Sequence, residues 1–337
     1  MRAGRIDDGL FGINEYSALG MYIIRGLKNL PSRFRNAVIA IGNFDGVHRG
    51  HQTLFARLRE LAAMHDQAAI MAVTFEPHPL RLLNPERTPP RITGLRGKAR
   101  WMEEAGVEAL FVLHFNRALA TMPPETFVRD ILVHGVGARE VVVGENFRFG
   151  AQGVGTFEDL ARMGRLHGFG VHAHPLVILD GQPVSSTWVR REVSVGAFAM
   201  AARLLDRPFE VEGRVVIGFQ RGRKLGFPTA NIALGGMLHP PIGVYVAKAC
   251  VGGCWLPAVV NVGRNPTFGD ADLRLEAHLL APVPMDLYRK ILRVQFLRHL
   301  RSEMRFPDVQ ALQAQIRRDV EQAQAHFASE NNTPSAT

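Results

Sequence analysis

A short segment, IGNFDGVHRGH at positions 41–51, constrains the fold of this chain more than any other segment. An apolar run, 37–41, leads into it, and an amphipathic run, 53–64, follows it. The pattern predicts a strand, a tight glycine-containing turn and the start of a helix. Because the first N–H groups of a helix have no partner within the helix, the turn is a candidate anion site. His48 and His51 would donate hydrogen bonds to phosphate oxygens there.

Apolar, strand-like runs alternate with helical patterns from residue 37 to about residue 200. Continuous apolar strands joined by helices are typical of a parallel sheet covered on both faces. Ligands bind such sheets at the carboxyl ends of the strands, where the 42–51, 76–79 and 144–150 segments are expected. The predicted strands are 38–41, 69–75, 109–113, 141–143 and 170–173, and the predicted helices include 53–64, 97–105, 124–133 and 156–167.

The second half of the chain has a different pattern. From residue 211 to about 296, short β-rich runs are separated by Gly, Pro and Asn, which predicts a small antiparallel barrel. A helix is expected at 308–327, because Val309, Leu312 and Ile316 fall on one face. The predicted barrel strands are 211–217, 244–249, 256–262, 275–280 and 291–296. The expected divisions are a disordered extension 1–20 (Met21 being a candidate natural start), a domain 21–202, a linker 203–210, a domain 211–327 and a disordered tail 328–337.

Composition narrows the class of partner. No run approaches the roughly 18 apolar residues of a membrane span, and the first twenty residues lack a secretory core. Cys250 and Cys254 make neither a disulfide framework nor a complete metal site, so a cytoplasmic protein is expected. The net charge is +9, but the Lys and Arg residues are scattered. Anionic nucleotides are therefore favoured as ligands over nucleic acid, and a non-enzymatic nucleic-acid binder is the alternative.

A second candidate phosphate site lies in GFQRGRKLGFPTANI, at 218–232. Its glycines would let the backbone approach phosphates closely. Thr229 and Asn231 alternate along an extended segment, so both face one side. A hydroxyl and an amide carbonyl are hard oxygen ligands, which suit Mg²⁺ bound beside ATP phosphates.

A third polar cluster is SSTWVRR, at 185–191. Its hydroxyls precede a helical run, and Arg190 lies one turn inside that run. Hydroxyls, free N–H groups and a guanidinium would together suit an anion. The alternative is an ordinary N-cap with a surface arginine.

These segments resemble one known family. GNFDGVHRGH resembles the HxGH signature of the nucleotidyltransferase superfamily, in the form seen in prokaryotic bifunctional riboflavin kinase/FMN adenylyltransferases, also called FAD synthetases. VVGENFRFG, SSTWVRR and GFQRGRKLGFPTANI resemble further motifs of that family in the family's order, and the resemblance covers roughly 21–324. It implies a doubly wound, Rossmann-like nucleotidyltransferase domain followed by a β-barrel riboflavin kinase domain with a C-terminal helix.

The resemblance also implies the reactions and their participants. The C-terminal domain would phosphorylate riboflavin with ATP to give FMN, and the N-terminal domain would adenylylate FMN with ATP to give FAD and pyrophosphate. Mg²⁺ would accompany ATP, held in the kinase by Thr229 and Asn231. The expected partners are riboflavin, FMN, FAD and ATP, with no nucleic acid or membrane, and the protein would be a monomer or a weak homo-oligomer.

For the adenylyltransferase, the resemblance implies a site around the two histidines. TFEPHP at 74–79 would lie near the flavin, although a loop histidine is the alternative for His78. The implied ATP contacts are Gly42, Asn43, Phe44, Asp45, His48, His51, Asn146, Ser186, Thr187 and Arg190, and the implied flavin contacts are His78, Pro79 and Phe149. His48 and His51 would be the catalytic residues.

For the kinase, the resemblance implies that Glu276 is the general base for the ribityl 5′-hydroxyl. Leu275 and Ala277 flank this carboxylate and would point to the opposite face of a strand. A solvent-facing glutamate is the alternative. The implied ATP contacts are Gly218, Gly222, Arg223, Lys224, Gly226, Pro228, Thr229 and Asn231, and the implied flavin contacts are Arg301 and Phe306.

Three positions depart from the family pattern. Arg289 replaces the glycine of a DLYG segment, Ala281 replaces an acid, and Asp206 replaces a frequent glycine. None belongs to the expected phosphate or metal groups. They motivate the alternative that only one domain is catalytic and the other is a flavin-binding regulatory module.

Overall fold

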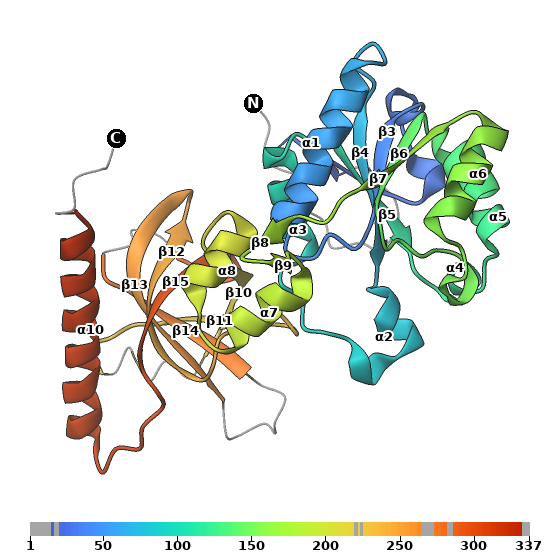
Figure 1. The fold of residues 1–337 in the computed structure, drawn as a ribbon. Helices are drawn as coiled ribbons and strands as arrows, with labels where there is room; N and C mark the ends of the chain where they lie inside the picture. The colour runs from blue at the N-terminus through green and yellow to red at the C-terminus, as the bar shows by residue number, and fades with distance from the viewer. Residues whose placement is uncertain are drawn as a thin grey trace. The chain divides into compact units, whose positions relative to one another are not determined.

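A computed structural model of the protein describes residues 15–16, 20–218, 222, 225–264, 273–281 and 286–331 (Figure 1). The chain forms two compact units. The first unit contains 1–89 and 95–183, and the second contains 90–94 and 184–337.

The first unit is built on a seven-stranded sheet with the order β1-β2-β5-β4-β3-β6-β7. All neighbouring strands are parallel except β1, which pairs antiparallel with β2. The predicted parallel sheet is therefore confirmed, and β1 and β2 extend it beyond the predicted strands. The strands are β1 (Glu15–Tyr16), β2 (Tyr22–Arg25), β3 (Val38–Ile41), β4 (Ile70–Glu76), β5 (Ala109–His114), β6 (Glu140–Gly144) and β7 (Gly170–His174).

Alternation along the strands explains how helices cover both faces of this sheet. Ile39 and Ile41 of β3 pack into one core cluster, which also contains Leu160 of α6. Val38 and Ala40 pack into another cluster, which contains residues of α1 and α3. The longer helical elements are α1 (Arg49–Ala63), α3 (Leu95–Glu104), the π-helical segment η4 (Phe127–Val136) and α6 (Phe157–His167). The shorter elements are η1 (Leu27–Asn29), η2 (Ser32–Phe34), α2 (Pro79–Leu83), η3 (Pro85–Arg87), α4 (Arg117–Ala120), α5 (Pro124–Thr126), η5 (Ala151–Gly153) and the hairpin β8 (Ile178–Leu179) and β9 (Gln182–Pro183).

The second unit contains a closed antiparallel barrel with the order β10-β11-β14-β13-β12-β15. This confirms the predicted barrel and adds one short strand, β11, inside the predicted phosphate motif. The strands are β10 (Glu210–Val216), β11 (Ala230–Ala233), β12 (Gly243–Val251), β13 (Cys254–Arg264), β14 (Leu273–Leu279) and β15 (Ile291–Arg301). The helices of this unit are α7 (Ser186–Ser194), α8 (Phe198–Leu205) and α10 (Val309–Asn331).

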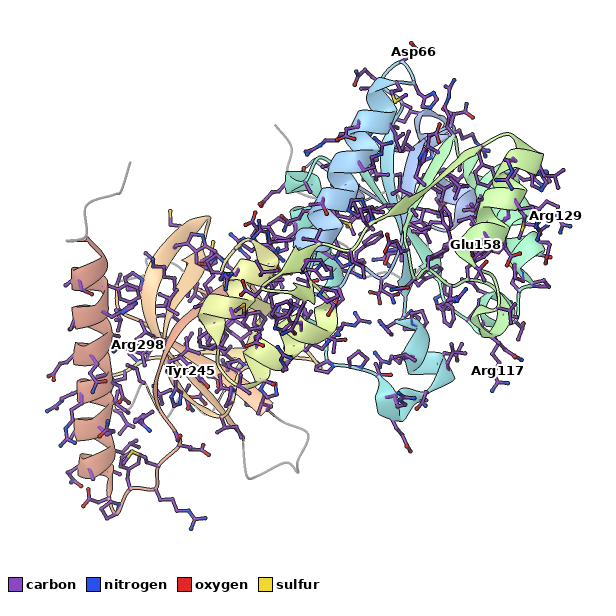
Figure 2. All side chains as sticks on the ribbon, viewed as in Figure 1. Asp66, Arg117, Arg129, Glu158, Tyr245 and Arg298 are labelled. Carbon is purple, nitrogen blue, oxygen red and sulfur yellow. The ribbon has the colours of Figure 1, made fainter. Side chains whose placement is uncertain are left out.

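Aromatic side chains connect α8 to the barrel strands. Phe198 of α8 stacks on Phe296, with ring centroids 5.7 Å apart, and meets the edge of Tyr245 at 5.8 Å. Tyr245 (labelled in Figure 2) is fully buried, and its hydroxyl donates a hydrogen bond to the carbonyl of Pro241. This burial raises the pKa of the phenol to about 12. Thus α8 packs with the barrel, although it begins before the domain boundary expected at residue 202.

The expected linker and flanking segments are more ordered than predicted. The linker 203–210 begins inside α8, and Asp206 then closes that helix in the left-handed region, at φ 58°. Helix α10 continues to Asn331, four residues beyond the predicted end at 327, into the segment that was expected to be disordered. Glu15 and Tyr16 form β1 within the expected disordered extension, and the other residues of 1–19 lie outside the described residues.

Candidate active sites

The 42–51 turn follows β3 at the carboxyl edge of the sheet. The Gly42 N–H donates to the Val73 carbonyl at 3.0 Å, and the Thr74 hydroxyl donates to the Asn43 carbonyl at 3.3 Å. Both contacts tie the turn to the neighbouring strand β4. The turn is tight, because Phe44, Gly46 and Val47 all have positive φ angles, of 49°, 84° and 43°.

The two histidines of this turn form one stacked pair. His48 is the residue before α1, and His51 lies in the first turn of that helix. Their ring centroids are 3.6 Å apart and the ring planes differ by 19°. Phe44, which is 2% exposed, meets His51 edge to face at 5.3 Å and fixes that ring from the core side. Asp45 and His48 are also buried, so the predicted strand, turn and helix place four of the expected ATP contacts in one compact structure.

The segment after β4 has a local structural role. His78 Nδ1 accepts a hydrogen bond from the Leu80 N–H at 3.2 Å, so His78 caps α2, which begins at Pro79. Nearby Lys98 of α3 is 5% exposed, and its amine lies 3.9 Å from Glu76 Oε1. The flavin contacts of His78 and Pro79 stay predictions.

The segment after β6 separates into an exposed and a buried part. Asn146 is exposed beside the end of β6. Phe149 is 6% exposed and belongs to the hydrophobic core, where it stacks on Phe147 at 5.7 Å and packs against Phe127 at 5.8 Å. Phe149 thus has a packing role, and the flavin contact that the resemblance implies stays a prediction.

The SSTWVRR segment belongs to the second compact unit. Ser185 caps α7 by accepting a hydrogen bond from the Trp188 N–H at 3.2 Å, and Ser186 and Thr187 form the first turn of that helix. Arg190 Nε donates to the Pro90 carbonyl at 2.8 Å. The N-cap is therefore real, and the ATP contacts of Ser186, Thr187 and Arg190 stay predictions.

His174, the last residue of β7, bonds to the first turns of α1. Its Nε2 is hydrogen-bonded to the Thr53 hydroxyl at 2.9 Å, and the same hydroxyl lies 3.1 Å from the Gly50 carbonyl. Desolvation by burial is the main cause that lowers the pKa of His174 below its usual 6.5. The positive charge of Arg57 lowers this pKa further, whereas Glu145 opposes the shift.

This lowered pKa predicts an acid-sensitive element of stability. The unfolded chain binds a proton at His174 more readily than the folded protein does. The contribution is therefore complete above about pH 6.5 and is lost as the pH falls through the folded pKa. We expect His174→Gln to make the fall in Tm between about pH 7 and pH 5 shallower than in the parent protein. The matched change at exposed His167 on α6 should leave the slope unchanged, and equal slopes for all three proteins would refute the prediction.

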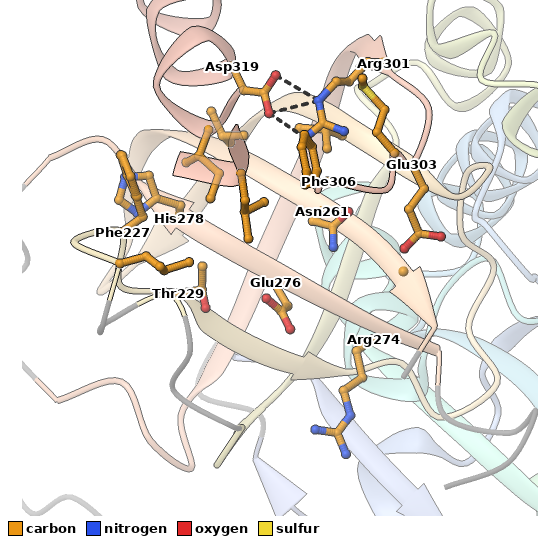
Figure 3. Close-up of a pocket in the computed structure, with 18 of the residues that line it drawn as sticks. Phe227, Thr229, Asn261, Arg274, Glu276, His278, Arg301, Glu303, Phe306 and Asp319 are labelled. Atoms are coloured by element: carbon orange, nitrogen blue, oxygen red, sulfur yellow. Dashed lines mark hydrogen bonds and ion pairs between the residues drawn. The ribbon is translucent and has the colours of Figure 1, made fainter. Parts of the chain in front are cut away.

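A cavity of about 480 Å³ lies in the second unit and brings the predicted kinase residues together (Figure 3). Strands β11, β13 and β14 supply most of its polar side chains, and α10 contributes Leu312, Ile316 and Asp319. The predicted site residues that line it are Gly222, Thr229, Asn231, Glu276, Arg301 and Phe306. Gly218, Gly226 and Pro228 do not line it, and Arg223 and Lys224 lie outside the described residues.

Strand register places Glu276 between two amides. Asn231 of β11 and Asn261 of β13 are both directly opposite Glu276 of β14, so the three side chains face the same side of the barrel. Leu275 and Ala277 are fully buried and face the other side. The predicted alternation around Glu276 is confirmed, and its carboxylate faces the cavity (Figure 3). Asn261 lay in a segment that the sequence associated with the kinase, but its pairing with Glu276 required the register.

Two glycines of the phosphate motif are required by close approach. A Cβ atom on Gly218 would lie 2.4 Å from the side-chain amide of Asn231, and one on Gly222 would lie 2.3 Å from the Phe227 carbonyl. Gly226 has a φ of 85°, which favours glycine. These residues therefore shape the loop around Thr229 and Asn231.

Arg301 has a role that the sequence did not show. Its guanidinium forms a bidentate ion pair with Asp319 of α10, at 3.0 Å from Nε to Oδ1 and 2.8 Å from Nη2 to Oδ2 (Figure 3). Asp319 also accepts from Gln315 at 2.9 Å, and its side chain is 4% exposed. The ring of Phe306 lies 5.8 Å from the guanidinium. Arg301 thus anchors α10 at the cavity, and direct flavin contact by Arg301 stays a prediction.

A second cavity, of about 540 Å³, adjoins the end of β14. Its lining includes Pro228 and the 286–288 segment, which precedes Arg289. Thr229 and His278 line both cavities. The sequence did not predict this cavity, because its walls come from segments about 50 residues apart.

Comparison with known proteins decides the family. Residues 30–188 match the FAD synthetase family and residues 205–327 match the riboflavin kinase family. The bifunctional riboflavin kinase/FMN adenylyltransferase of Pseudomonas fluorescens is 42% identical over 306 residues, which cover 90% of this chain and 97% of that protein. The chain belongs to the bifunctional riboflavin kinase/FMN adenylyltransferase family. The Escherichia coli K12 member is 38% identical over 309 residues, covering 91% and 98% of the two chains.

Membership of this family assigns an activity to each part of the chain. The N-terminal part is the FMN adenylyltransferase and the C-terminal part is the riboflavin kinase, in the order that the motifs predicted. ATP is the co-substrate of both reactions.

One solved structure extends the likeness to the fold. It is named as a macrolide-efflux protein from Streptococcus pneumoniae, and it covers 90% of this chain and 98% of its own, with a TM-score of 0.77 and 29% identity. In the part of the chain that the structure describes, no helix is long and apolar enough to cross a membrane.

Proposed function

We propose that the kinase binds riboflavin in the first cavity and ATP in the second, with the transferred phosphoryl group between them at Thr229. The observation that carries this assignment is that Thr229 lines both cavities while Glu276 faces only the first. A nucleotide in the second cavity would then direct its phosphates toward the carboxylate that faces the first. This arrangement would hold the two reacting groups close together.

Magnesium fits the residues around Thr229. Asn231 is 6% exposed, and the missing side chain of Gly218 leaves room for its amide. Within the described ranges, no group of three or more His, Cys, Asp or Glu is placed to hold a metal, so the protein ligands would be the Thr229 hydroxyl and the Asn231 amide oxygen. These are hard oxygen donors that suit Mg²⁺ alongside ATP phosphates. When bound, Mg²⁺ would neutralise part of the phosphate charge.

In the kinase reaction, Glu276 accepts the proton of the ribityl 5′-hydroxyl as the oxygen attacks the γ-phosphorus. The new O–P bond gives FMN, and the bond from the γ-phosphorus to its bridging oxygen breaks to release ADP. Asn231 and Asn261 are directly opposite Glu276 on the two neighbouring strands and would limit the orientations of its carboxylate. The 5′-hydroxyl is thereby presented to a fixed base.

In the adenylyltransferase reaction, an FMN phosphate oxygen attacks the α-phosphorus of ATP, and the bond to the departing pyrophosphate breaks. No protein nucleophile is needed. The stacked His48 and His51 would donate hydrogen bonds to the triphosphate at the N-terminus of α1, with Asn43 as a further expected contact.

The protein is further proposed to act in the cytoplasm as a monomer or a weak homo-oligomer, without a nucleic-acid or membrane partner. The scattered basic residues and the nucleotide-binding motifs support this proposal.

A product assay tests the two activities together. The protein is given riboflavin, Mg²⁺ and ATP, and FMN and FAD are separated by chromatography over time. We expect FMN to appear first and FAD to follow. FMN that accumulates without FAD, or FAD that forms only from supplied FMN, would instead support the alternative with a single catalytic domain.

A further inference from the structure

The imidazole of His278 lines two cavities of the second unit. It lies on β14 two residues after Glu276, so both side chains face the same side of the strand. It lines both the first and the second cavity, and among the described residues only Thr229 shares that property. A side chain in this position can influence both the proposed ATP site and the proposed riboflavin site of the kinase.

The imidazole of His278 holds the loop that leads into β11. Its Nδ1 lies 2.9 Å from the Pro228 carbonyl. Since a carbonyl only accepts, Nδ1 carries the proton and donates it. The edge of the same imidazole meets the Phe227 ring, with centroids 5.6 Å apart (Figure 3). The residue before Thr229 is thus held from the neighbouring strand.

We propose that His278 is a positioning residue of the kinase, which fixes the Thr229 hydroxyl for Mg²⁺ and the ATP phosphates by holding the Pro228 carbonyl. The proposal rests on the proposed role of Thr229. The loop around Thr229 needs such a restraint, because Gly222 and Gly226 lower its stiffness on the N-terminal side. The hydrogen bond from His278 to the Pro228 carbonyl supplies this restraint between Gly226 and Thr229.

Two substitutions distinguish the effect of losing this hydrogen bond from the effect of losing the imidazole ring. The side-chain nitrogen of asparagine falls near the Nδ1 position of histidine, whereas that of glutamine falls near Nε2. His278→Asn should therefore keep the bond to Pro228, and His278→Gln should lose it. We expect His278→Gln to raise the KM for MgATP by about three- to tenfold, as for the loss of one hydrogen bond, with a parallel rise in the Mg²⁺ concentration for half-maximal rate. His278→Asn should stay within about twofold of the parent protein, and the KM for riboflavin should change little in either variant.

A matched control exists in the same unit. His239 Nδ1 donates to a prolyl carbonyl, that of Pro240, at 2.7 Å, but His239 lines neither cavity. His239→Gln should leave the KM for MgATP unchanged. Thermal unfolding followed by circular dichroism on the same samples reports whether each variant is folded.

Three outcomes overturn the proposal. Equal kinetics for His278→Asn and His278→Gln would show that the hydrogen bond does not matter. A fall in kcat for both substrates with no change in the KM for MgATP would show a merely structural role. An equal rise in the KM for MgATP in His239→Gln would show a general effect on the barrel. The proposed function fails separately, if Glu276→Gln leaves FMN formation intact.

Discussion

Replacing Glu276 with glutamine should stop FMN formation while FAD still forms from supplied FMN. Glutamine has nearly the same shape, so the strand pairing with Asn231 and Asn261 should persist. It cannot accept the hydroxyl proton, and loss of a general base typically slows a reaction by about 10²–10⁴-fold. The rate of FMN formation is measured with riboflavin, and the rate of FAD formation is measured in a second reaction started from FMN.

The control for this experiment is Glu321→Gln, the same chemical change at an exposed position on α10. It should preserve both rates. An active Glu276→Gln protein would mean that the glutamate is a surface carboxylate without a catalytic role. Loss of both activities in a folded Glu276→Gln protein would mean that the two reactions do not use separate sites.

Replacing His48 with alanine should have the reverse effect. The rate of FAD formation should fall by about 10²–10³-fold, as for the loss of one transition-state hydrogen-bond donor. The stacked geometry places the effect at the upper end of this range, because His51 loses the ring that lies 3.6 Å away. FMN formation from riboflavin should remain at the parental rate, since the kinase residues lie in the other compact unit.

His167→Ala is the matched control for that variant, because His167 is exposed at the end of α6 in the same unit. The two products are quantified after fixed times with each substrate supplied separately. A His48→Ala protein that makes FAD at an unchanged rate would contradict the role of the HxGH turn.

The long apolar runs predicted the parallel sheet well, because a strand that is buried on both faces has consecutive apolar residues in the sequence. Strands β3, β4 and β5 lie within a residue or two of their predicted bounds. The missed strands β2 and β11 are four residues each, and a run that short carries little periodicity. The expected boundary at residue 202 falls inside α8, because the sequence shows that Phe198 is apolar, but not which aromatic cluster it joins.

In the candidate sites too, the sequence predicted features that depend on neighbouring residues and missed features that depend on residues far apart in the chain. Alternation along β14 predicted the orientation of Glu276, since it depends on its two neighbours only. The ion pair of Arg301 joins residues 18 positions apart, one on a strand and the other on a helix. No local sequence pattern therefore predicts it. The flavin contact of Phe149 stays a prediction, and the burial of its ring became visible only in the folded core.

Two departures from the family pattern now have a structural description. Asp206 and Arg289, which stand where the family often has glycine, both adopt positive φ angles, of 58° and 64°. The backbone therefore keeps the conformation that glycine would favour, although a non-glycine residue adopts it at a cost of about 1–2 kcal/mol. At Arg289 the N–H still donates to the Val215 carbonyl at 2.9 Å.

The ion pair between Arg301 and Asp319 joins the barrel to α10, and these two parts of the chain supply different kinds of residue to the first cavity. Barrel strands supply the reactive groups, whereas the anchored helix α10 supplies apolar wall residues such as Leu312 and Ile316. With the flavin in the first cavity, as proposed, substitutions on the helix are expected to alter which flavin analogues fit without changing Glu276 or its two amide neighbours. Substrate range and catalytic chemistry would then depend on different parts of the chain, and a designer would vary one while holding the other constant.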